Sequence, residues 1–286
     1  MPYLFEVLGQ DAGASFAWPR GPRERARLRQ AVLAVLGPAL HRLAALAGVR
    51  SEPSGTARLL DDFLAVYAAR PLADNTGGSG LNDSLWLYCI ARLVAPSLIV
   101  ESGTWRGQSA WLFRQAAPQA AIHSFDLERP AGPFHETPGV HYHLCDWTER
   151  AIAPSPRGPS LLFFDDHVSH ARRLGEAAGR GFSLALFDDN FPAEQLHATG
   201  APPVPSLAML CEADPDAAGG IIEWQRNGKI YRYHDTAERR AAARDLVDEL
   251  LVLPELAPVT RHAPGSRMTM VRLCVKDVER GKHHGS

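Results

Sequence analysis

The first third of the chain repeats apolar residues at the spacing of amphipathic helices. Between residues 22 and 49, leucine and valine recur at steps of three and four positions, which is typical of one buried helix face. Gly37 and Pro38 lie inside this stretch and predict an interruption, because proline lacks the N–H that a helix interior requires. The same spacing over 56–69 and 83–94 predicts two further helices.

The pattern changes after residue 96. Segments of helical or loop character separate five short apolar runs, at 97–101, 121–126, 140–145, 160–165 and 183–188. Apolar runs of this length are typical of strands buried on both faces of a parallel sheet, and their alternation with helices is typical of the α/β class. The sequence therefore predicts an α/β fold around a mostly parallel sheet flanked by helices.

The C-terminal part is expected to add antiparallel structure. Residues 220–233 resemble a hairpin that turns at Asn227 and Gly228, a helix is expected over 236–252, and a strand over 267–276. We divide the chain into a helical N-terminal cap or lid region, 1–82, and an α/β domain, 83–286.

Composition and charge narrow the classes of partner. The 286 residues contain 30 Lys and Arg against 32 Asp and Glu, so no net positive field favours nucleic acid or an acidic membrane surface. The four cysteines lack CxxC spacing and are expected to be reduced thiols. No secretory leader and no apolar run of about 20 residues is evident. We predict a cytoplasmic, bacterial protein without nucleic-acid or membrane partners.

A glycine-containing turn follows the first apolar run. Glu101 ends that run, and Gly103 and Gly107 lead into a helix predicted over 108–117. Glycine lets the backbone approach a ligand closely, and a helix N-terminus presents unpaired N–H groups. The spacing differs from the GxGxxG fingerprint of dinucleotide-binding proteins, which disfavours a nicotinamide dehydrogenase. A plain strand-to-helix turn is the alternative.

Acidic residues also follow the next two apolar runs. Asp126 ends one of them, and Asp146, with Trp147 beside it, ends the other. Ligands of open α/β sheets bind outside the carboxyl ends of the strands. There Asp126 could accept both ribose hydroxyls of a nucleoside, while Asp146 and Trp147 meet an adenine ring. Alternatively, both acids are helix caps or solvated loop residues.

Two pairs of acids follow the last two apolar runs. Asp165 and Asp166 end one run, and Asp188 and Asp189 end the next. Because one predicted βαβ unit joins them, both pairs are expected at the same edge of the sheet. Four neighbouring carboxylates repel one another unless a cation neutralises them, and oxygen ligands favour Mg²⁺, Mn²⁺ or Ca²⁺. Capping of the following helix is the alternative for Asp166 and Asp189.

Two histidines follow the first acidic pair. His167 and His170 begin the predicted helix 168–180. A neutral imidazole near a metal-bound hydroxyl could accept its proton as a general base. With 12 histidines in the chain, a coincidental placement is the alternative.

Two loops are candidates for ligand contact. Residues 70–82 form a polar, glycine-rich loop in which Asn75, Thr76 and Gly77 are expected to contact the cofactor or to act as a lid, although a flexible connection has the same composition. The proline-rich loop 192–205 is expected to influence substrate choice. Trp105, inside the glycine turn, is expected to be a packing residue, with shielding of a bound ligand as the alternative.

These motifs resemble the class I S-adenosylmethionine (SAM)-dependent methyltransferases. The glycine turn followed by FFDDHVSH and LFDDN over roughly 72–192 is most similar to the group of cephalosporin-hydroxylase-like proteins and rhamnosyl O-methyltransferases, and more distantly to macrocin-type sugar O-methyltransferases. The resemblance implies a Rossmann-like methyltransferase sheet, SAM as cofactor and a divalent metal. The first acid of the second pair is often Glu in that group, whereas here it is Asp188.

The resemblance implies an O-methyltransferase that acts on a hydroxyl of a small molecule, such as a sugar or a natural-product intermediate. The predicted cofactor site consists of Glu101, Gly103, Thr104, Gly107, Ser109, Asp126, Asp146, Trp147, Asn75, Thr76 and Gly77. The predicted metal ligands are Asp165, Asp188 and Asp189, and the predicted catalytic residues are His167 and His170. A metal-dependent hydrolase, another transferase or a non-catalytic scaffold remains open, as does homo-oligomer formation through the N-terminal helices.

Overall fold

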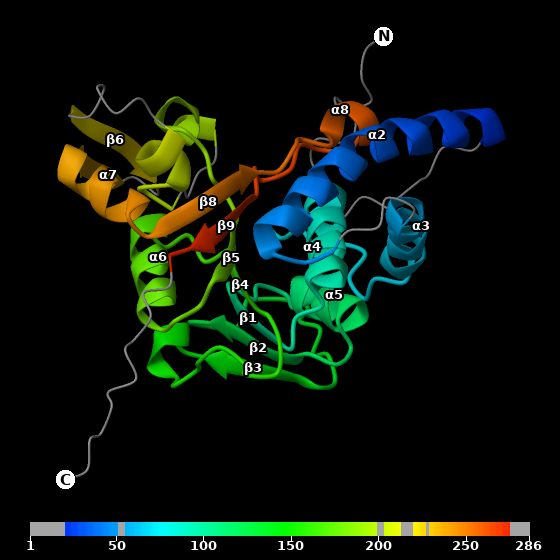
Figure 1. Ribbon diagram of the computed structural model, residues 1–286, viewed down its shortest axis with the longest axis horizontal. Helices are drawn as coiled ribbons and strands as arrows, with labels where there is room; N and C mark the ends of the chain where they lie inside the picture. The colour runs from blue at the N-terminus through cyan, green and yellow to red at the C-terminus, as the bar shows by residue number, and fades with distance from the viewer. Residues whose placement is uncertain (1–20, 51–54, 199–202, 213–219, 227–228, 275–286) are drawn as a thin grey trace.

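The computed structural model describes residues 21–50, 55–198, 203–212, 220–226 and 229–274. Its centre is a seven-stranded sheet with helices on both faces (Figure 1). The strands are β1 (Leu98–Ser102), β2 (Ala121–Asp126), β3 (Val140–Leu144), β4 (Ser160–Phe164), β5 (Leu184–Phe187), β6 (Gly220–Arg226), β7 (Lys229–Asp235), β8 (Val247–Val252) and β9 (Thr269–Leu273). The α-helices are α2 (Pro22–Ala47), α3 (Gly55–Ala68), α4 (Leu81–Val94), α5 (Gln108–Ala116), α6 (His170–Gly179), α7 (Ala237–Arg244) and α8 (Ala257–Thr260).

The strand order is β3-β2-β1-β4-β5-β9-β8. The five strands from β3 to β5 run parallel to their neighbours, β9 is antiparallel to β5, and β8 is antiparallel to β9. The predicted α/β class and the mostly parallel, Rossmann-like sheet are thus confirmed, and antiparallel strands enter at the C-terminal end as expected. Four of the five predicted parallel strands differ from the observed ones by one residue at an end or at both ends.

The predicted C-terminal hairpin forms a sheet of its own. Strands β6 and β7 pair with each other and not with the main sheet, and the predicted turn residues, Asn227 and Gly228, lie outside the described residues. The helix predicted over 236–252 is wrong in its second half, because α7 ends at Arg244 and Val247–Val252 forms β8. Pairing with β9 buries Leu251 in the core, and this tertiary contact outweighs local helical propensity.

Helix α2 is continuous, so the interruption predicted at Gly37 and Pro38 is wrong. Pro38 lies inside the helix, and Leu36 and Leu40 on either side of it are buried. Packing of this apolar face against the rest of the protein maintains the helix despite the missing hydrogen bond.

Two hydrophobic layers cover the two faces of the sheet. One contains side chains of α2, α3, α4 and α5 together with alternate strand residues such as Ile99, Phe163 and Leu186. The other contains side chains of α6 and α7 with the intervening strand residues, among them Val100 and Phe164. In Figure 1 the two sets of helices lie on opposite sides of the sheet. Odd-numbered residues of β1 therefore face α4 and α5, while even-numbered ones face the layer of α6 and α7.

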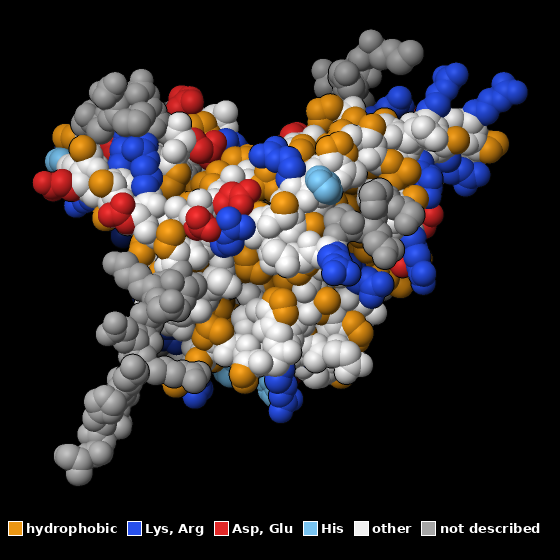
Figure 2. All heavy atoms as spheres, in the orientation of Figure 1, with side chains coloured by type: hydrophobic (Ala, Val, Ile, Leu, Met, Phe, Trp, Pro, Cys, Tyr) orange, Lys and Arg blue, Asp and Glu red, His pale blue; other side chains and the backbone are white. Residues whose placement is uncertain are grey.

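The N-terminal helices share their core with the α/β part. Leu36 of α2 and Phe63 of α3 belong to the same buried cluster as Leu253 and Met270 near the end of the chain. The predicted domain boundary at 82/83 falls just inside α4, and a lid role for the N-terminal helices stays a prediction. By length and composition α2 could also span a membrane, but its apolar face packs against α4 in the way expected of a core helix. Arginine side chains stand along its outer end (Figure 2).

The four cysteines are free thiols, as the sequence predicts. Cys89 is buried in α4, and burial raises the pKa of its thiol to about 12. The other three are half-buried rather than part of the deep core.

Candidate active site

The parallel strands create a switch point beside β1. Chain connections leave β1 toward β2 on one side and reach β4 on the other. Crevices for ligands open at the carboxyl ends of strands where the order reverses in this way. The turn after β1, at residues 103–107, and the segment after β4 meet at this point.

Gly103 is required by both its backbone angle and its neighbours. It has a φ of 105°, and a Cβ there would overlap the backbone carbonyl of Asp165 after β4. Gly107 has a φ of 84°, and a Cβ on it would overlap the carbonyl of His135. The two glycines thus let three chain segments approach one another closely at the start of α5.

The glycine-rich loop before α4 lies against this turn. The indole Nε1 of Trp105 donates to the carbonyl of Thr76 at 3.1 Å, and a Cβ on Gly77 would lie 3.4 Å from the Trp105 ring. Arg106 donates to the carbonyl of Asp74 at 3.3 Å. The structure therefore brings the predicted loop residues Asn75, Thr76 and Gly77 to the predicted turn, with Trp105 between them.

Glu101 is fully buried beneath the turn. It accepts a hydrogen bond from Ser124 of β2, and Ser124 also contacts the hydroxyl of Thr104 at 2.6 Å. Burial raises the pKa of Glu101 to about 7, although hydrogen bonds from Ser109 and Ser124 act in the opposite direction. Its Oε1 accepts no hydrogen bond from the described residues. A buried polar atom of this kind is costly and is available to a ligand donor.

We expect Glu101→Gln to change how stability depends on pH. In the metal-free protein the folded state holds the Glu101 proton more tightly than the unfolded state, whose pKa is near 4.5. The stability that proton binding by Glu101 adds to the folded state is therefore fully present below pH 4.5 and is lost as the pH rises to about 7. Urea unfolding between pH 5 and 8 is expected to show the variant gaining roughly 3 kcal/mol relative to the wild type as pH rises. A constant difference between the two proteins would contradict the shift.

Asp126 holds the other side of the turn. Its Oδ2 accepts from the backbone N–H of Trp105 at 3.0 Å, and its Oδ1 accepts from Leu127 at 2.8 Å. It lines a shallow surface recess together with Thr104, Phe134 and Tyr142. Asp126 is thus at the end of β2 and beside the glycine turn, where the sequence predicts it.

Asp146 and Trp147 make contacts within the protein at the end of β3, and the adenine contact predicted for Trp147 is wrong because its ring is buried. Asp146 caps the short 3-10 helix 147–149 by accepting from the backbone N–H of Thr148, as the capping alternative predicts. It also pairs with Arg173 at 2.9 Å. Trp147 has no exposed surface, packs on Phe164 and Phe182 and donates to Glu176 at 3.2 Å. Trp147 is therefore a core residue, because apolar burial of its ring leaves no face for a ligand.

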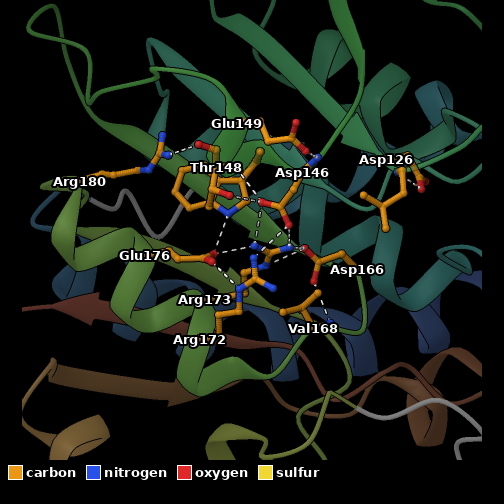
Figure 3. Close-up of polar contacts among 12 residues, drawn as sticks. Asp126, Asp146, Thr148, Glu149, Asp166, Val168, Arg172, Arg173, Glu176 and Arg180 are labelled. Atoms are coloured by element: carbon orange, nitrogen blue, oxygen red, sulfur yellow. Dashed lines mark hydrogen bonds and ion pairs between the residues drawn. The ribbon is translucent and has the colours of Figure 1, made fainter.

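Arg173 of α6 ties two strand ends together. The side chain is 1% exposed and reaches Asp146 at 2.9 Å, Asp166 at 2.7 Å and Glu176 at 2.6 Å. Figure 3 shows the three carboxylates surrounding its guanidinium group, with Arg172 at the outer edge. Although burial alone acts in the opposite direction, these hydrogen bonds hold the pKa of Asp146 well below its usual range and raise that of Arg173.

Strand alternation separates the members of the first acidic pair. Asp165 continues the side of β4 that carries Phe163 and faces the α4 layer, and Asp166 continues the side that faces α6. Asp166 accepts from Arg173 and from the N–H of Val168 at 3.1 Å. It therefore stabilises the turn 165–168, while Asp165 remains on the side of the predicted metal site.

Asp165, His167 and Asp189 form the group that could hold a metal ion. One ligand atom from each residue lies within 4.8 Å of the others, and Nδ1 of His167 is 3.3 Å from Oδ2 of Asp189. Burial raises the pKa of Asp165 to about 8. Burial, followed by the charge of Asp165, raises the pKa of Asp188 well above its ordinary value. A divalent cation would relieve this repulsion.

His170 is not available as a base, which corrects that prediction. It is 2% exposed, and its Nδ1 accepts from the backbone N–H of Leu207 at 3.1 Å. Burial lowers its pKa to about 3, with a hydrogen bond to the backbone of Asp188 as the opposing influence. His170 therefore connects the segment after β5 to α6. His167, by contrast, has a side chain that is 43% exposed at the edge of the acidic group.

Two residues that sequence reasoning missed belong to this site. Asp83 in the first turn of α4 accepts from the backbone N–H of Ser266 at 2.9 Å, and the hydroxyl of Ser266 contacts both Asp83, at 3.2 Å, and Asp188. Burial raises the pKa of Asp83 to about 6. An acid in the first turn of a helix looks like a dipole partner. No local signal in the sequence links it to residues 183 and 105 positions further along the chain.

The residues present fit both predicted groups. For SAM, the fit rests on the unpaired buried Oε1 of Glu101 beside the glycine turn. For a divalent cation, it rests on an oxygen-rich donor set with one imidazole, which suits Mg²⁺ or Mn²⁺.

Comparison with protein-family models finds no match, and comparison with curated proteins finds none either. Among solved structures, the chain is similar to cmcI-N160 with SAH (17% identity, 40% of this chain, 63% of that chain, TM-score 0.35). It is similar to the SAH-bound methyltransferase PaMTH1 of Podospora anserina (15%, 76% and 87%, TM-score 0.38). It is also similar to cmcI-D160 Mg-SAM (14%, 68% and 73%, TM-score 0.40).

The chain spans less than two thirds of the first of these structures, and all three identities and TM-scores are low. The Rossmann-like arrangement of the sheet therefore rests on the strand order and strand directions of this chain itself.

Proposed function

We propose that the protein is an SAM-dependent and divalent-metal-dependent O-methyltransferase that acts on a hydroxyl of a small molecule. The observation that carries the proposal is the group of Asp165, His167 and Asp189, whose ligand atoms lie within 4.8 Å of one another. This group follows β4 and β5, and Asp165 directly contacts the glycine turn at Gly103. A metal site and a cofactor turn thus adjoin at one switch point of the sheet.

Residues of the turn would bind the methyl donor. Glu101 offers its unpaired Oε1 to a donor group, and Asp126 at the end of β2 retains lone pairs for ribose hydroxyls. The loop 74–78 would cover this site, because it already packs on Trp105. SAM supplies a methyl group activated on a positively charged sulfur, so these residues contribute chiefly positioning and exclusion of water.

Asp165, Asp188 and Asp189 would hold the cation. His167, whose ring also lies within reach of that position, would stay unligated and accept the proton of the acceptor hydroxyl. A divalent cation lowers the pKa of an oxygen bound to it. With Nδ1 of His167 beside Asp189, we assign Nε2 as the proton acceptor. When bound, SAM would supply the methyl carbon to the hydroxyl oxygen and would leave as a neutral thioether with the electron pair of the broken carbon–sulfur bond, while His167 would take the hydroxyl proton.

Calorimetric titration of chelator-stripped protein with SAM, with and without Mn²⁺, tests the proposal. We expect SAM to bind in both conditions, because the turn and the metal group use different residues. Metal binding without SAM affinity would instead favour a metal-dependent hydrolase, and binding of neither would favour a non-catalytic scaffold.

Asp189→Asn is expected to weaken Mn²⁺ binding by about 100-fold and to leave SAM affinity within about twofold. The reason is that Asp189 belongs to the metal group and forms no hydrogen bond or ion pair with the glycine turn among the described residues. Asp62→Asn on α3, which loses a similar charge in an exposed ion pair at 3.7 Å, serves as the control. Equal loss of both ligands in the Asp189 variant would show that the two sites are not separate.

The remaining sequence predictions belong to this proposal. They are a sugar or natural-product acceptor, Mg²⁺ as the physiological metal and a cytoplasmic, bacterial setting. On the same basis we propose that the protein has no nucleic-acid or membrane partner. We also propose that it forms homo-oligomers through the N-terminal helices.

A further inference from the structure

A cavity of about 350 Å³ is lined in part by Asp83. Its walls come from the start of α4, the segment between β8 and α8, the residues before β9 and the segment after β5. This volume is within the range of small-molecule sites.

The apolar part of the wall is well defined. Trp86 and Met268 are nearly fully buried, at 3% and 2% exposure, and the Trp86 indole donates to the carbonyl of Pro254 at 3.2 Å. Phe191, Leu253 and Leu256 complete this surface. Because the indole N–H is already bonded within the protein, the cavity presents the apolar faces of these side chains to a ligand.

Most polar side chains of the wall are bonded to the protein itself. Asn82 donates to Ala263 at 2.7 Å and accepts from Thr260 at 2.8 Å. Glu255 accepts from two backbone N–H groups, at 2.8 and 3.0 Å. Arg267 pairs with Glu212 at 2.6 Å. These groups maintain the shape of the wall, so a ligand with many hydroxyls would lose hydration without gaining equivalent partners.

Asp83 connects the cavity to the proposed metal site. It lines the cavity, and its Oδ1 accepts from Ser266, whose hydroxyl also contacts Asp188. Asp83 itself is therefore two hydrogen bonds from the carboxylate of Asp188.

We propose that this cavity binds the methyl acceptor, and that the acceptor carries its hydroxyl on a flat, mostly apolar framework, as a phenol does, rather than being a free sugar. This inference rests on the proposed function and narrows its substrate class. Asp83 acts as the positioning residue at the part of the cavity linked to Asp188, and Trp86, Phe191 and Met268 contact the framework.

Equilibrium dialysis of the full chain tests the inference, with p-nitrophenol and methyl glucoside as probes in the presence of SAH and Mn²⁺. We expect p-nitrophenol to bind at millimolar or lower concentration and methyl glucoside not to bind. Preferential binding of the glucoside, or no binding of p-nitrophenol, would overturn the substrate class.

Variants that fill the cavity locate the binding site. Met268→Trp is expected to weaken p-nitrophenol binding at least about tenfold, and Gln195→Trp at the exposed rim is expected to do the same without altering the core. Ala242→Trp, in the other large cavity, is the control and should bind p-nitrophenol as the wild type does. Undiminished binding in the Gln195 variant, measured on folded protein, would remove the assignment even if the Met268 variant fails to fold.

Titration with SAM alone separates the two proposals. SAM affinity should be unchanged in the Gln195 and Ala242 variants, because each residue lines a cavity that includes no residue of the glycine turn. Loss of p-nitrophenol binding with SAM binding retained supports both proposals. Absence of SAM binding in the wild type would refute the acceptor role, whatever the phenol does.

Discussion

Gly103→Ala is expected to destabilise the protein by roughly 4 kcal/mol. Alanine at a φ of 105° carries backbone strain of about 1–3 kcal/mol. Its Cβ would also overlap the Asp165 carbonyl, and relief by movement of packed backbone costs a further 1–3 kcal/mol, roughly. Urea unfolding followed by circular dichroism measures the change.

Gly37→Ala is the matched control for Gly103. Gly37 lies inside α2, and a Cβ there would meet nothing within 4 Å apart from its chain neighbours. We expect this variant to stay within about 1 kcal/mol of the wild type, because the higher helix propensity of alanine is opposed by crowding of its Cβ against the ring of Pro38. A Gly103 variant that unfolds at the urea concentration of the Gly37 variant would contradict the close contact between the turn and β4.

Arg173→Met is expected to cost about 3–5 kcal/mol of stability. The substitution removes the buried partner of Asp146, Asp166 and Glu176 and leaves carboxylates without a compensating charge. Hydrogen bonds from Arg173 lower the pKa of Asp146 below its usual range. That contribution is present above the unfolded pKa of 3.8 and is lost as the pH falls below it. The difference between variant and wild type should therefore shrink in acid.

The neighbouring residue Arg172 supplies the control. It pairs with Glu176 at 2.6 Å and with Asp146 at 3.6 Å, but its side chain is 55% exposed. Because solvent screens exposed ion pairs, Arg172→Met is expected to cost no more than about 1 kcal/mol. If thermal unfolding gave equal losses for the two variants, burial of Arg173 would not be the source of its effect.

Much of the site could be predicted because strand ends are marked locally. Apolar runs that stop at Asp126, at Asp165 and at Asp188 identify the carboxyl edge of a parallel sheet, and Gly103 identifies the turn that approaches it. The structure places these residues together at that edge. Positions 165 and 166 are both Asp, however, so the sequence pattern alone does not assign them different partners.

Other site features depend on distant contacts. Ser266 comes from the segment before β9 and Asp83 from α4, and only the packing of α4 beside the antiparallel strands brings them to Asp188. Trp147 looked like a ligand platform, but the layer of α6 covers its ring. Residues 247–252 looked helical until β9 provided a partner for a strand.

The sequence by itself determined the periods of the N-terminal helices and of the five parallel strands, and the residue types at the strand ends, because these depend on local geometry. Tertiary structure decided which acid faces a guanidinium and which faces another carboxylate. Asp166 pairs with Arg173 on the α6 side, while Asp165 meets Asp188 on the α4 side. The free energy of a buried charge depends on its neighbours in space, which the chain supplies only when folded.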